Sequence, residues 1–284
     1  MDRLGDKEFS VLFENLNNFI FEDGIWYSKR TLNNVSYPET GNSSCAEVEE
    51  DSYWFNHRNN IIVAIADRFF NEKSIVDIGG GNGYVSKALF NNGFKTCIVE
   101  PGESGIIKAR ENGLSNLINS TFDELKLPEN SLTNAGLFDV LEHIENDEDF
   151  IKELYKNIKK DGKVLIAVPA YNFLWSKADV EAGHFRRYNL KSISRLLEKS
   201  GFKIIYKSYF FFYLIPIIFL VRTIPYLLTL GKIKSRHAKK WEHNAGSNLI
   251  FRLISFFNSV ELKYIKKGKR IPLGSSCIIV AEKN

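Results

Sequence analysis

The chain has 284 residues, a length that suits one large domain or one domain with a modest accessory part. Its apolar content of 44% is enough for a packed core, which excludes bulk disorder, and its net charge of +4 does not by itself indicate nucleic-acid binding. Cys45, Cys97 and Cys277 are far apart and form neither a zinc spacing nor a disulfide framework. The first residues are charged and lack the apolar run of a signal peptide, so we expect a cytoplasmic protein.

The N-terminal region contains two predicted helices. Apolar residues recur at helical spacing from Phe9 to Leu16, which predicts the first helix. Residues 33–44 are rich in Asn, Ser, Pro and Gly and predict a loop. A second helix is expected over residues 53–69, beginning with an aromatic run that is followed by Arg58.

A glycine-rich turn follows the second helix. The apolar run over residues 74–78 suits a buried parallel strand, and Gly79, Gly81 and Gly83 come directly after it. Glycine lets a backbone turn sharply and allows a ligand to approach it closely. The pattern therefore predicts a nucleotide-binding strand–turn–helix unit. It is not the G-x-G-x-x-G fingerprint of dinucleotide sites, because Tyr84 stands where the third glycine would be needed.

Strands and helices alternate along the rest of the chain, as a doubly wound sheet requires. Further strands are predicted over residues 95–99, 117–122, 135–140, 163–168, 203–209 and 275–282, with helices over 104–112 and 147–158 and a tight turn at 160–162. Glu100 ends one of these strands, 17 residues beyond Gly83. A carboxylate at such a position can accept hydrogen bonds from both hydroxyls of a ribose.

Two motifs resemble those of class I S-adenosylmethionine-dependent methyltransferases. They are Val-Asp-Ile-Gly-x-Gly-x-Gly over residues 76–83 and Asp-Val-Leu-Glu-His over residues 139–143, and the resemblance covers about residues 53–202. It implies an enzyme that uses S-adenosylmethionine and has an α/β, doubly wound, seven-stranded Rossmann-like sheet whose last strand is antiparallel. It also implies an N-terminal helical lid over the cofactor. A glycine turn without a ligand and a non-catalytic, cofactor-binding scaffold are the alternatives.

The resemblance also implies a set of cofactor-binding residues, which are Asp77, Gly79, Gly81, Gly83, Glu100, Phe122, Asp139 and Arg58. The Arg58 guanidinium would match the methionine carboxylate of the cofactor, and the alternative is that Arg58 is a surface charge. Thr121 stands where the family commonly has an acidic residue against the adenine, so the backbone amide of Phe122 is expected to serve instead. His143 is expected to orient its loop more than to act as a base.

The stretch from Ala170 to Tyr188 resembles a Trp-Ser…Asp…Gly-His-x-Arg-Arg-Tyr block of bacterial methyltransferases often found beside sugar and cell-envelope genes. It follows the fifth strand of the predicted core, so it should form a wall of the methyl-acceptor pocket. The resemblance suggests His184 as general base and Tyr188 as a hydrogen-bond donor to the acceptor. The other expected acceptor-binding residues are Arg186, Arg187, Tyr171 and Trp175. Alternatively, the block only pins the loop, with Arg186 or Arg187 paired to Asp179 or Glu181. No metal site is expected.

Residues 210–230 form the most apolar stretch of the chain. A membrane-spanning helix needs roughly 20 apolar residues, but Pro216, Arg222 and Pro225 interrupt this one. The chain must also return to place its last strand in the same sheet, so no crossing is expected. Basic residues follow at Lys232, Lys234, Arg236, Lys239 and Lys240. A helical cap over the pocket, a homodimer contact and peripheral contact with anionic lipid are the alternatives.

These inferences divide the chain into an N-terminal helical lid (1–60), a cofactor-binding core (61–209), a helical insertion (210–272) and a final core strand (273–284). The expected reaction is methyl transfer to a small molecule, with O-methylation of a saccharide or of an envelope or secondary-metabolite precursor favoured. An N-methyltransferase of a natural-product pathway is the alternative. Nucleic acid is not an expected partner, because no Asn/Asp-Pro-Pro-Tyr tetrapeptide follows the fourth strand.

Overall fold

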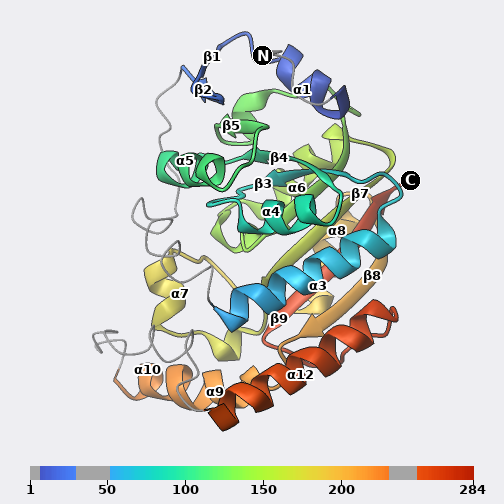
Figure 1. Ribbon diagram of the computed structural model, residues 1–284. Coiled ribbons are helices and arrows are strands. Elements are labelled where there is room, and N and C mark those ends of the chain that lie inside the picture. The colour runs from blue at the N-terminus through green and yellow to red at the C-terminus, as the bar shows by residue number, and fades with distance from the viewer. Residues whose placement is uncertain (1–6, 30–51, 230–247) are drawn as a thin grey trace.

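The computed structural model of the protein describes residues 7–29, 52–229 and 248–284 (Figure 1). The loop predicted over residues 33–44, Cys45 and the basic residues between 232 and 240 lie outside these ranges. Within them, a nine-stranded sheet carries helices on both faces, which confirms the predicted α/β, doubly wound class.

The strands lie in the spatial order β1-β2-β5-β4-β3-β6-β7-β9-β8. Their bounds are β1 Phe19–Glu22, β2 Ile25–Ser28, β3 Ser74–Ile78, β4 Lys95–Val99, β5 Leu117–Asn119, β6 Leu132–Phe138, β7 Ile158–Pro169, β8 Phe202–Phe210 and β9 Ser276–Lys283. Strands β3 to β7 pair in parallel, whereas β9 pairs antiparallel with both β7 and β8. These seven strands are the predicted sheet, with its final strand inserted antiparallel as expected.

The prediction of seven strands was wrong because the hairpin β1–β2 extends one edge of the sheet. Strand β2 runs parallel to β5, with Trp26 opposite Ile118. Asp23 and Gly24 form the turn of the hairpin, and both have positive φ angles, 48° and 83°. Two-residue hairpin turns favour Asp-Gly because both positions need such angles. The region before residue 60 is therefore not purely helical.

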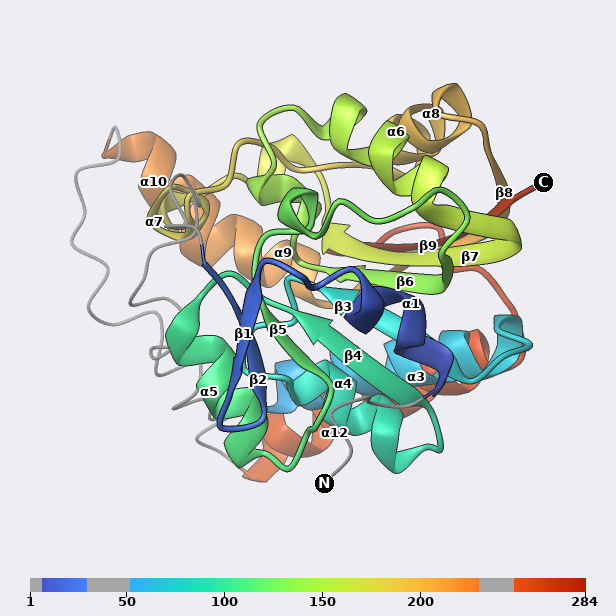
Figure 2. The same cartoon turned by 90° about the horizontal axis from the view of Figure 1, so that it is seen from above.

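Helices cover the two faces of the sheet, as Figure 2 shows from above. One face carries α1 (Ser10–Glu14), α6 (Asp147–Asn157) and α8 (Leu190–Lys199), and the other carries α3 (Tyr53–Phe69), α4 (Tyr84–Asn91), α5 (Glu103–Glu111) and α12 (Asn248–Lys266). Helix α1 buries Leu12 and Phe13 in the core against the sheet. Among the described residues of the predicted lid, those at the start of α3 line the ligand cavity described below.

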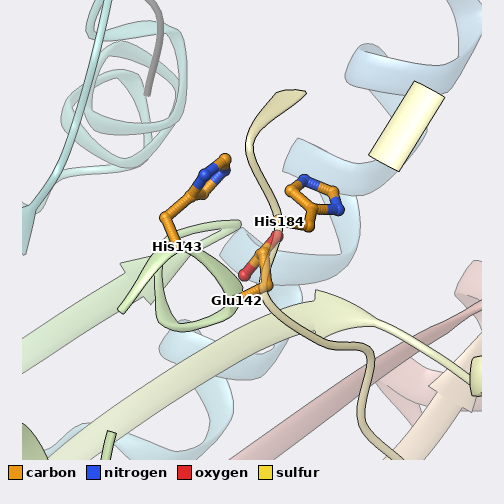
Figure 3. A group of neighbouring side chains, drawn as sticks. All are labelled: Glu142, His143 and His184. Carbon is orange, nitrogen blue, oxygen red and sulfur yellow. The ribbon is translucent and has the colours of Figure 1, made fainter. Parts of the chain in front are cut away.

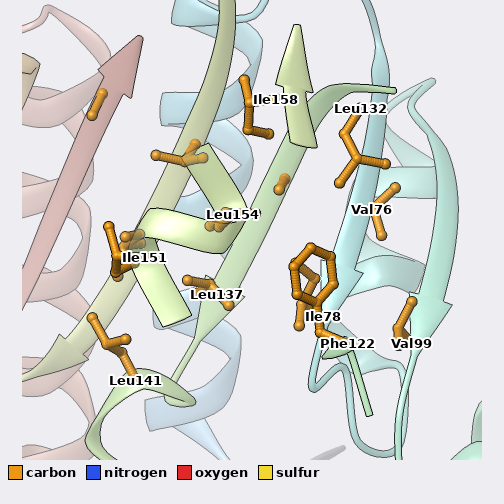
Figure 4. Close-up of a cluster of buried hydrophobic side chains, with 14 of the residues drawn as sticks. Val76, Ile78, Val99, Phe122, Leu132, Leu137, Leu141, Ile151, Leu154 and Ile158 are labelled. Atoms are coloured by element: carbon orange, nitrogen blue, oxygen red, sulfur yellow. The ribbon is translucent and has the colours of Figure 1, made fainter. Parts of the chain in front are cut away.

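Alternating side chains of the central strands build a core on each side of the sheet. In β7, Val164 and Ile166 point into the core shown in Figure 4, which also contains Leu154 of α6. Leu165 of the same strand points to the opposite core, where Ile62 of α3 is packed. Strands buried on both faces are apolar throughout, which is why the sequence shows them as continuous apolar runs.

Strand β7 begins earlier than predicted. It starts at Ile158, and residues 160–162, predicted to be a tight turn, lie within the strand. Asp161 has a φ of 64°, and the pairing register with β6 shifts between Leu132 and Asn134. The sequence at residues 160–162, which predicted a turn between two elements, thus forms an irregularity within strand β7.

The predicted helical insertion follows β8. Helix α9 (Leu214–Ile218), the π-helical segment η5 (Phe219–Thr223) and α10 (Ile224–Leu228) follow one another directly. Glu261 of α12 anchors this region, because its carboxylate lies 2.8 Å from Nε2 of the buried His57 of α3 and accepts a hydrogen bond from the Phe211 N–H at 2.8 Å. Among the residues that the structure describes, no helix is both long enough and apolar enough to cross a membrane.

Candidate active site

A cavity of about 830 Å³ opens at the carboxyl ends of β3, β4 and β6. This is the position where ligands bind in open α/β sheets, and the volume suits a ligand of drug size together with a small second molecule. The glycine turn and Glu100 line one part of the cavity, and His143, His184 and Arg187 line another. We call the first part the cofactor side and the second the acceptor side.

The glycine turn has a backbone that other residues would not adopt easily. Gly79 and Gly83 have φ angles of 73° and 76°. A Cβ atom on Gly79 would lie 2.7 Å from a methyl group of Val140, and one on Gly83 would lie 2.7 Å from Leu114. Gly79 and Gly81 line the cavity, and Gly83 caps the start of α4. The turn therefore lines the cavity with bare backbone, and its contact with a ligand stays a prediction.

Two buried carboxyl groups flank this turn. Glu100 accepts a hydrogen bond from the Gly81 N–H at 2.9 Å and another from the Gly102 N–H at 2.7 Å, which fix its carboxylate at the cavity. Asp77 accepts from the Ser86 hydroxyl at 2.7 Å. Burial raises the pKa of Asp77 to about 6, against the opposing effects of Ser86 and Arg58.

Arg58 is buried rather than a surface charge. Its guanidinium forms an ion pair with Asp139, and its Cζ lies 5.2 Å from the ring centre of Trp54 and 5.3 Å from that of Phe55. All four residues line the cavity. The start of α3 and the end of β6 are thus joined at the mouth of the cofactor side.

The expected adenine corner lies after β5. Thr121, Phe122 and Asp123 line the cavity, and the Phe122 ring packs against Phe150 of α6 with ring centres 5.7 Å apart. Burial, together with the charges of nearby Glu153 and Glu124, raises the pKa of Asp123. The structure therefore brings Phe122 to the position expected from the sequence.

His184 lines the acceptor side, and its imidazole is held by a carboxylate. Its Nδ1 lies 2.9 Å from Oδ1 of Asp179, which is 1% exposed. Because that carboxylate only accepts hydrogen bonds, Nδ1 carries the proton of the neutral ring and Nε2 is left as an acceptor. Asp179 lies in α7 (Lys177–Ala182), and Gly183 ends this helix with a φ of 76°.

Arg187 pairs with the same carboxylate, as the alternative interpretation of the block proposed. Its Nε donates to Asp179 Oδ1 at 2.6 Å and its Nη2 to Oδ2 at 3.0 Å. Ser176 adds a backbone hydrogen bond at 2.8 Å. Burial favours the neutral form of Asp179, but the hydrogen bonds from His184 and Arg187 outweigh it, so the pKa of Asp179 lies well below its usual range. The block both pins the loop and presents His184 to the cavity.

Four residues of the 170–188 block that were expected to contact the acceptor have side chains directed to other partners or positions. The Tyr188 hydroxyl donates to Asp147 at 2.6 Å, and Arg186 pairs with the same carboxylate at 2.7 Å. Tyr171 stacks on Tyr209 with ring centres 5.0 Å apart, and Trp175 follows η4 (Asn172–Leu174). These four side chains are not among those that line the cavity.

Glu142 is a site residue that sequence reasoning missed. It follows β6 in the turn η3 (Leu141–His143) and is fully buried, and neither of its carboxylate oxygens has a hydrogen-bond partner among the residues that the structure describes. Burial, and next the charge of Asp139, raise the pKa of Glu142 well above its usual range. Glu142 also lines the cavity, and burial there favours the protonated form of its carboxyl group.

Glu142, His143 and His184 come together from two loops (Figure 3). Their nearest nitrogen and oxygen atoms all lie within 4.8 Å of one another, which would allow them to share a cation. Burial and the neighbouring His184 lower the pKa of His143 to about 4, so this ring is neutral at pH 7. The expectation that no metal is needed stays a prediction.

Arg222 of η5 is the second site residue that was missed. It lines the cavity together with Arg187, although its helix is the most apolar in the chain. Burial and the charge of Arg187 lower the pKa of Arg222 to about 10, so it remains a cation at neutral pH. The acceptor side is thus lined by two guanidinium groups.

The cofactor side fits S-adenosylmethionine. Gly79 and Gly81 line the cavity with backbone that carries no side chain, and two backbone N–H groups fix the Glu100 carboxylate at the cavity, where a carboxylate suits ribose hydroxyls. Glu100, Phe122 and the glycine turn would hold the nucleoside half of the cofactor.

Comparison with known proteins agrees with this geometry. Residues 55–207, more than half of the chain, match the family described as methyltransferase domain. A probable S-adenosylmethionine-dependent methyltransferase of Mycolicibacterium smegmatis is 23% identical over 59% of this chain and 66% of its own length. A ubiquinone biosynthesis O-methyltransferase of Rickettsia conorii is 29% identical over 57% of this chain and 62% of its own length. The match thus spans less than two thirds of either relative.

Solved structures show the same fold at low sequence identity. A possible histamine N-methyltransferase of Thermotoga maritima aligns with a TM-score of 0.54 at 16% identity, over 88% of this chain and 100% of its own. A phosphoethanolamine N-methyltransferase 2 of Haemonchus contortus in complex with S-adenosyl-L-methionine gives 0.53 at 17% identity, over 91% and 61%. The chain belongs to the methyltransferase-domain family, within the class I S-adenosylmethionine-dependent methyltransferases.

Proposed function

We propose that the protein transfers the methyl group of S-adenosylmethionine to a hydroxyl oxygen of a small-molecule acceptor, with His184 as the general base. The observation that supports this most directly is the Asp179–His184 pair, with 2.9 Å between Oδ1 and Nδ1, in the cavity that also contains the glycine turn. Asp179 fixes the tautomer and orientation of the ring, and Nε2 is left to accept a proton.

The bound cofactor supplies an electrophilic methyl group on a positively charged sulfur. The acceptor oxygen forms the new C–O bond as the bond from the methyl carbon to sulfur breaks, and the hydroxyl proton passes to His184 Nε2. Asp179 stabilises the imidazolium that results, because a buried carboxylate attracts it strongly. Trp54 and Phe55 cover the cavity and limit the access of water.

The acceptor in this proposal is a saccharide or an envelope or secondary-metabolite precursor that carries an anionic group. Arg222 lines the acceptor side, and a guanidinium group suits phosphate or carboxylate, whereas the Arg187 guanidinium is held by Asp179. The relative of Rickettsia conorii is named a ubiquinone biosynthesis O-methyltransferase, which supports oxygen as the acceptor atom. We also propose a cytoplasmic location for the protein. The division of the chain into a lid, a core, an insertion and a final strand, with boundaries after residues 60, 209 and 272, belongs to the same proposal.

Substitution of His184 tests the proposal. Radiolabelled methyl transfer from S-adenosylmethionine would be screened against hydroxylated and amine acceptors, with and without phosphate groups. With the best hydroxylated acceptor, we expect His184→Ala to lower turnover by about 10²–10⁴-fold while S-adenosylhomocysteine affinity stays within twofold. His57→Gln, at the anchor between α3 and α12, is the control for loss of a buried histidine.

Three outcomes would contradict the proposal. Near-wild-type turnover of His184→Ala would remove the histidine from the mechanism. Transfer only to amines would favour the N-methyltransferase alternative. Cofactor binding without transfer to any acceptor would favour the non-catalytic scaffold.

A further inference from the structure

The helix formed by α9, η5 and α10 has an unusual distribution of polarity. Its exposed side chains are apolar, and Leu228, Leu220, Leu227 and Val221 are 79%, 62%, 61% and 58% exposed. They recur at positions 217, 220, 221, 227 and 228, which form one face of a helix. The charged residue of this helix, Arg222, lines the cavity on the inner side. A helix at a water-facing surface normally has the opposite arrangement.

Helix α12 also has exposed apolar side chains, and it lies at the same end of the molecule, opposite the β1–β2 hairpin (Figure 1). Leu253, Phe256, Val260 and Tyr264 are all exposed and again lie on one helical face. Phe212, which precedes α9, contacts Phe257 of α12 with ring centres 5.6 Å apart. The two apolar stripes therefore belong to neighbouring parts of one surface.

The charge of this region separates it from the rest of the chain. Residues 210–272 contain twelve of the 38 Lys and Arg residues but two of the 34 Asp and Glu residues, so their net charge is +10 against −6 for the remainder. One of the two acids, Glu261, is buried against His57, and the other, Glu242, lies outside the described ranges. Exposed Arg252, Lys263 and Lys266 lie on α12 beside its apolar stripe.

We propose that these two apolar faces and their basic residues form a docking surface for an anionic lipid bilayer. Apolar side chains flanked by Lys and Arg are what an interfacial helix needs, because the side chains enter the acyl boundary while the cations contact anionic headgroups. A second copy of the chain is less well matched, since the exposed Arg252, Lys263 and Lys266 beside the stripe would face the same cations on that copy. Docking would place Arg222, and with it the acceptor side of the cavity, next to the headgroups.

Vesicle flotation tests the proposal independently of catalysis and of the acceptor. The full-length protein would be mixed with vesicles of phosphatidylcholine that contain about one quarter phosphatidylglycerol, or with vesicles of phosphatidylcholine alone. Each mixture would be prepared at about 50 mM and at about 500 mM NaCl, because charge interactions are screened beyond about 10 Å at 0.1 M salt and over shorter distances as the salt concentration rises. We expect flotation with the anionic vesicles at low salt, and at least tenfold less with either neutral vesicles or high salt.

The variant Leu227→Glu/Leu228→Glu should lose flotation about tenfold, because it places charges at the most exposed apolar positions. Ile20→Glu, at an exposed apolar position of β1 at the opposite end of the molecule, is the matched control and should float like wild type. Circular dichroism and S-adenosylhomocysteine calorimetry would show that both variants are folded. Absence of wild-type flotation at low salt, or unchanged flotation of the double variant, would overturn the proposal. So would a wild-type dimer that the double variant dissociates, without vesicle binding.

Discussion

The two sides of the cavity differ in the groups that line them, which are mainly backbone on the cofactor side and mainly side chains on the acceptor side. The cofactor side consists mainly of backbone, at the glycine turn that follows β3, and of Glu100 held by main-chain N–H groups. The acceptor side consists of charged and imidazole side chains, among which Asp179 of α7 binds both His184 and Arg187 of the loop that follows this helix. A backbone site depends on local conformation, whereas a buried charge network depends on every partner being present. The following predictions separate these two designs.

The largest effect is expected from breaking the charge network. Arg187→Met would leave the Asp179 carboxylate, which is 1% exposed, with one cation fewer. Removing one partner of a buried ion pair costs about 3–5 kcal/mol, so the midpoint of urea denaturation should fall accordingly. Arg186→Met is the control, because its pair with Asp147 is more exposed. Equal destabilisation by the two substitutions would show that the Asp179 network is not special.

On the cofactor side, the contribution of Asp77 to the free energy of unfolding should depend on pH. The pKa of Asp77 is raised from 3.8 to about 6, so the folded, cofactor-free protein binds its proton more tightly than the unfolded chain. This contribution to stability is present below pH 4 and is lost as the pH rises through about 6, a difference of about 3 kcal/mol. Asp77→Asn should therefore be stabilising relative to wild type at pH 8 but not at pH 4. Chemical denaturation at both values would check this, and a pH-independent difference would contradict it.

A smaller effect is expected from Glu100→Gln. The amide replaces one acceptor oxygen by a donor that faces a backbone N–H, either that of Gly81 or that of Gly102. Loss of one hydrogen bond to a charged group costs about 2 kcal/mol, so S-adenosylhomocysteine should bind about 30-fold more weakly by calorimetry. Glu103→Gln, in the first turn of α5, is the control for loss of a nearby negative charge. Unchanged affinity would show that Glu100 does not contact the cofactor.

Metal removal should have no effect. The proposed reaction uses His184 Nε2 as the proton acceptor, and a cation bound to that nitrogen would block it, so no step calls for a metal at the Glu142–His143–His184 group. Treatment with EDTA should leave methyl transfer within twofold, and adding Mg²⁺, Mn²⁺ or Zn²⁺ should not raise it. Loss of activity with EDTA and its recovery with one of these ions would assign a cation to the Glu142–His143–His184 group.

The same contrast explains what the sequence could predict. The glycine turn and Glu100 were found because the chemistry lies in their own spacing along the chain. Glu142 was quoted in a motif but given no role, since its protonation depends on burial by segments far away in sequence. In the sequence Arg222 only interrupts an apolar stretch, and nothing local indicates that it faces a cavity.

Other differences have local causes. The hairpin β1–β2 had a readable signal, an Asp-Gly pair between short aromatic segments, which the weak hydrophobic pattern of the region obscured. Tyr188 and Arg186 were expected at the acceptor because of their residue types. Both instead bind Asp147 on the other side of their loop, and side-chain direction at such positions is decided by partners that spacing does not reveal.

The place of β9 in the sheet has a consequence for synthesis on the ribosome. This strand, residues 276–283, lies between β7 and β8, so β8 has no paired strand and β7 is paired only with β6 until these late residues have emerged. The nascent chain must hold two unpaired strand edges until then, and such edges are sites of aggregation. A stop codon a few residues before β9 should therefore give insoluble protein rather than a slightly shortened enzyme.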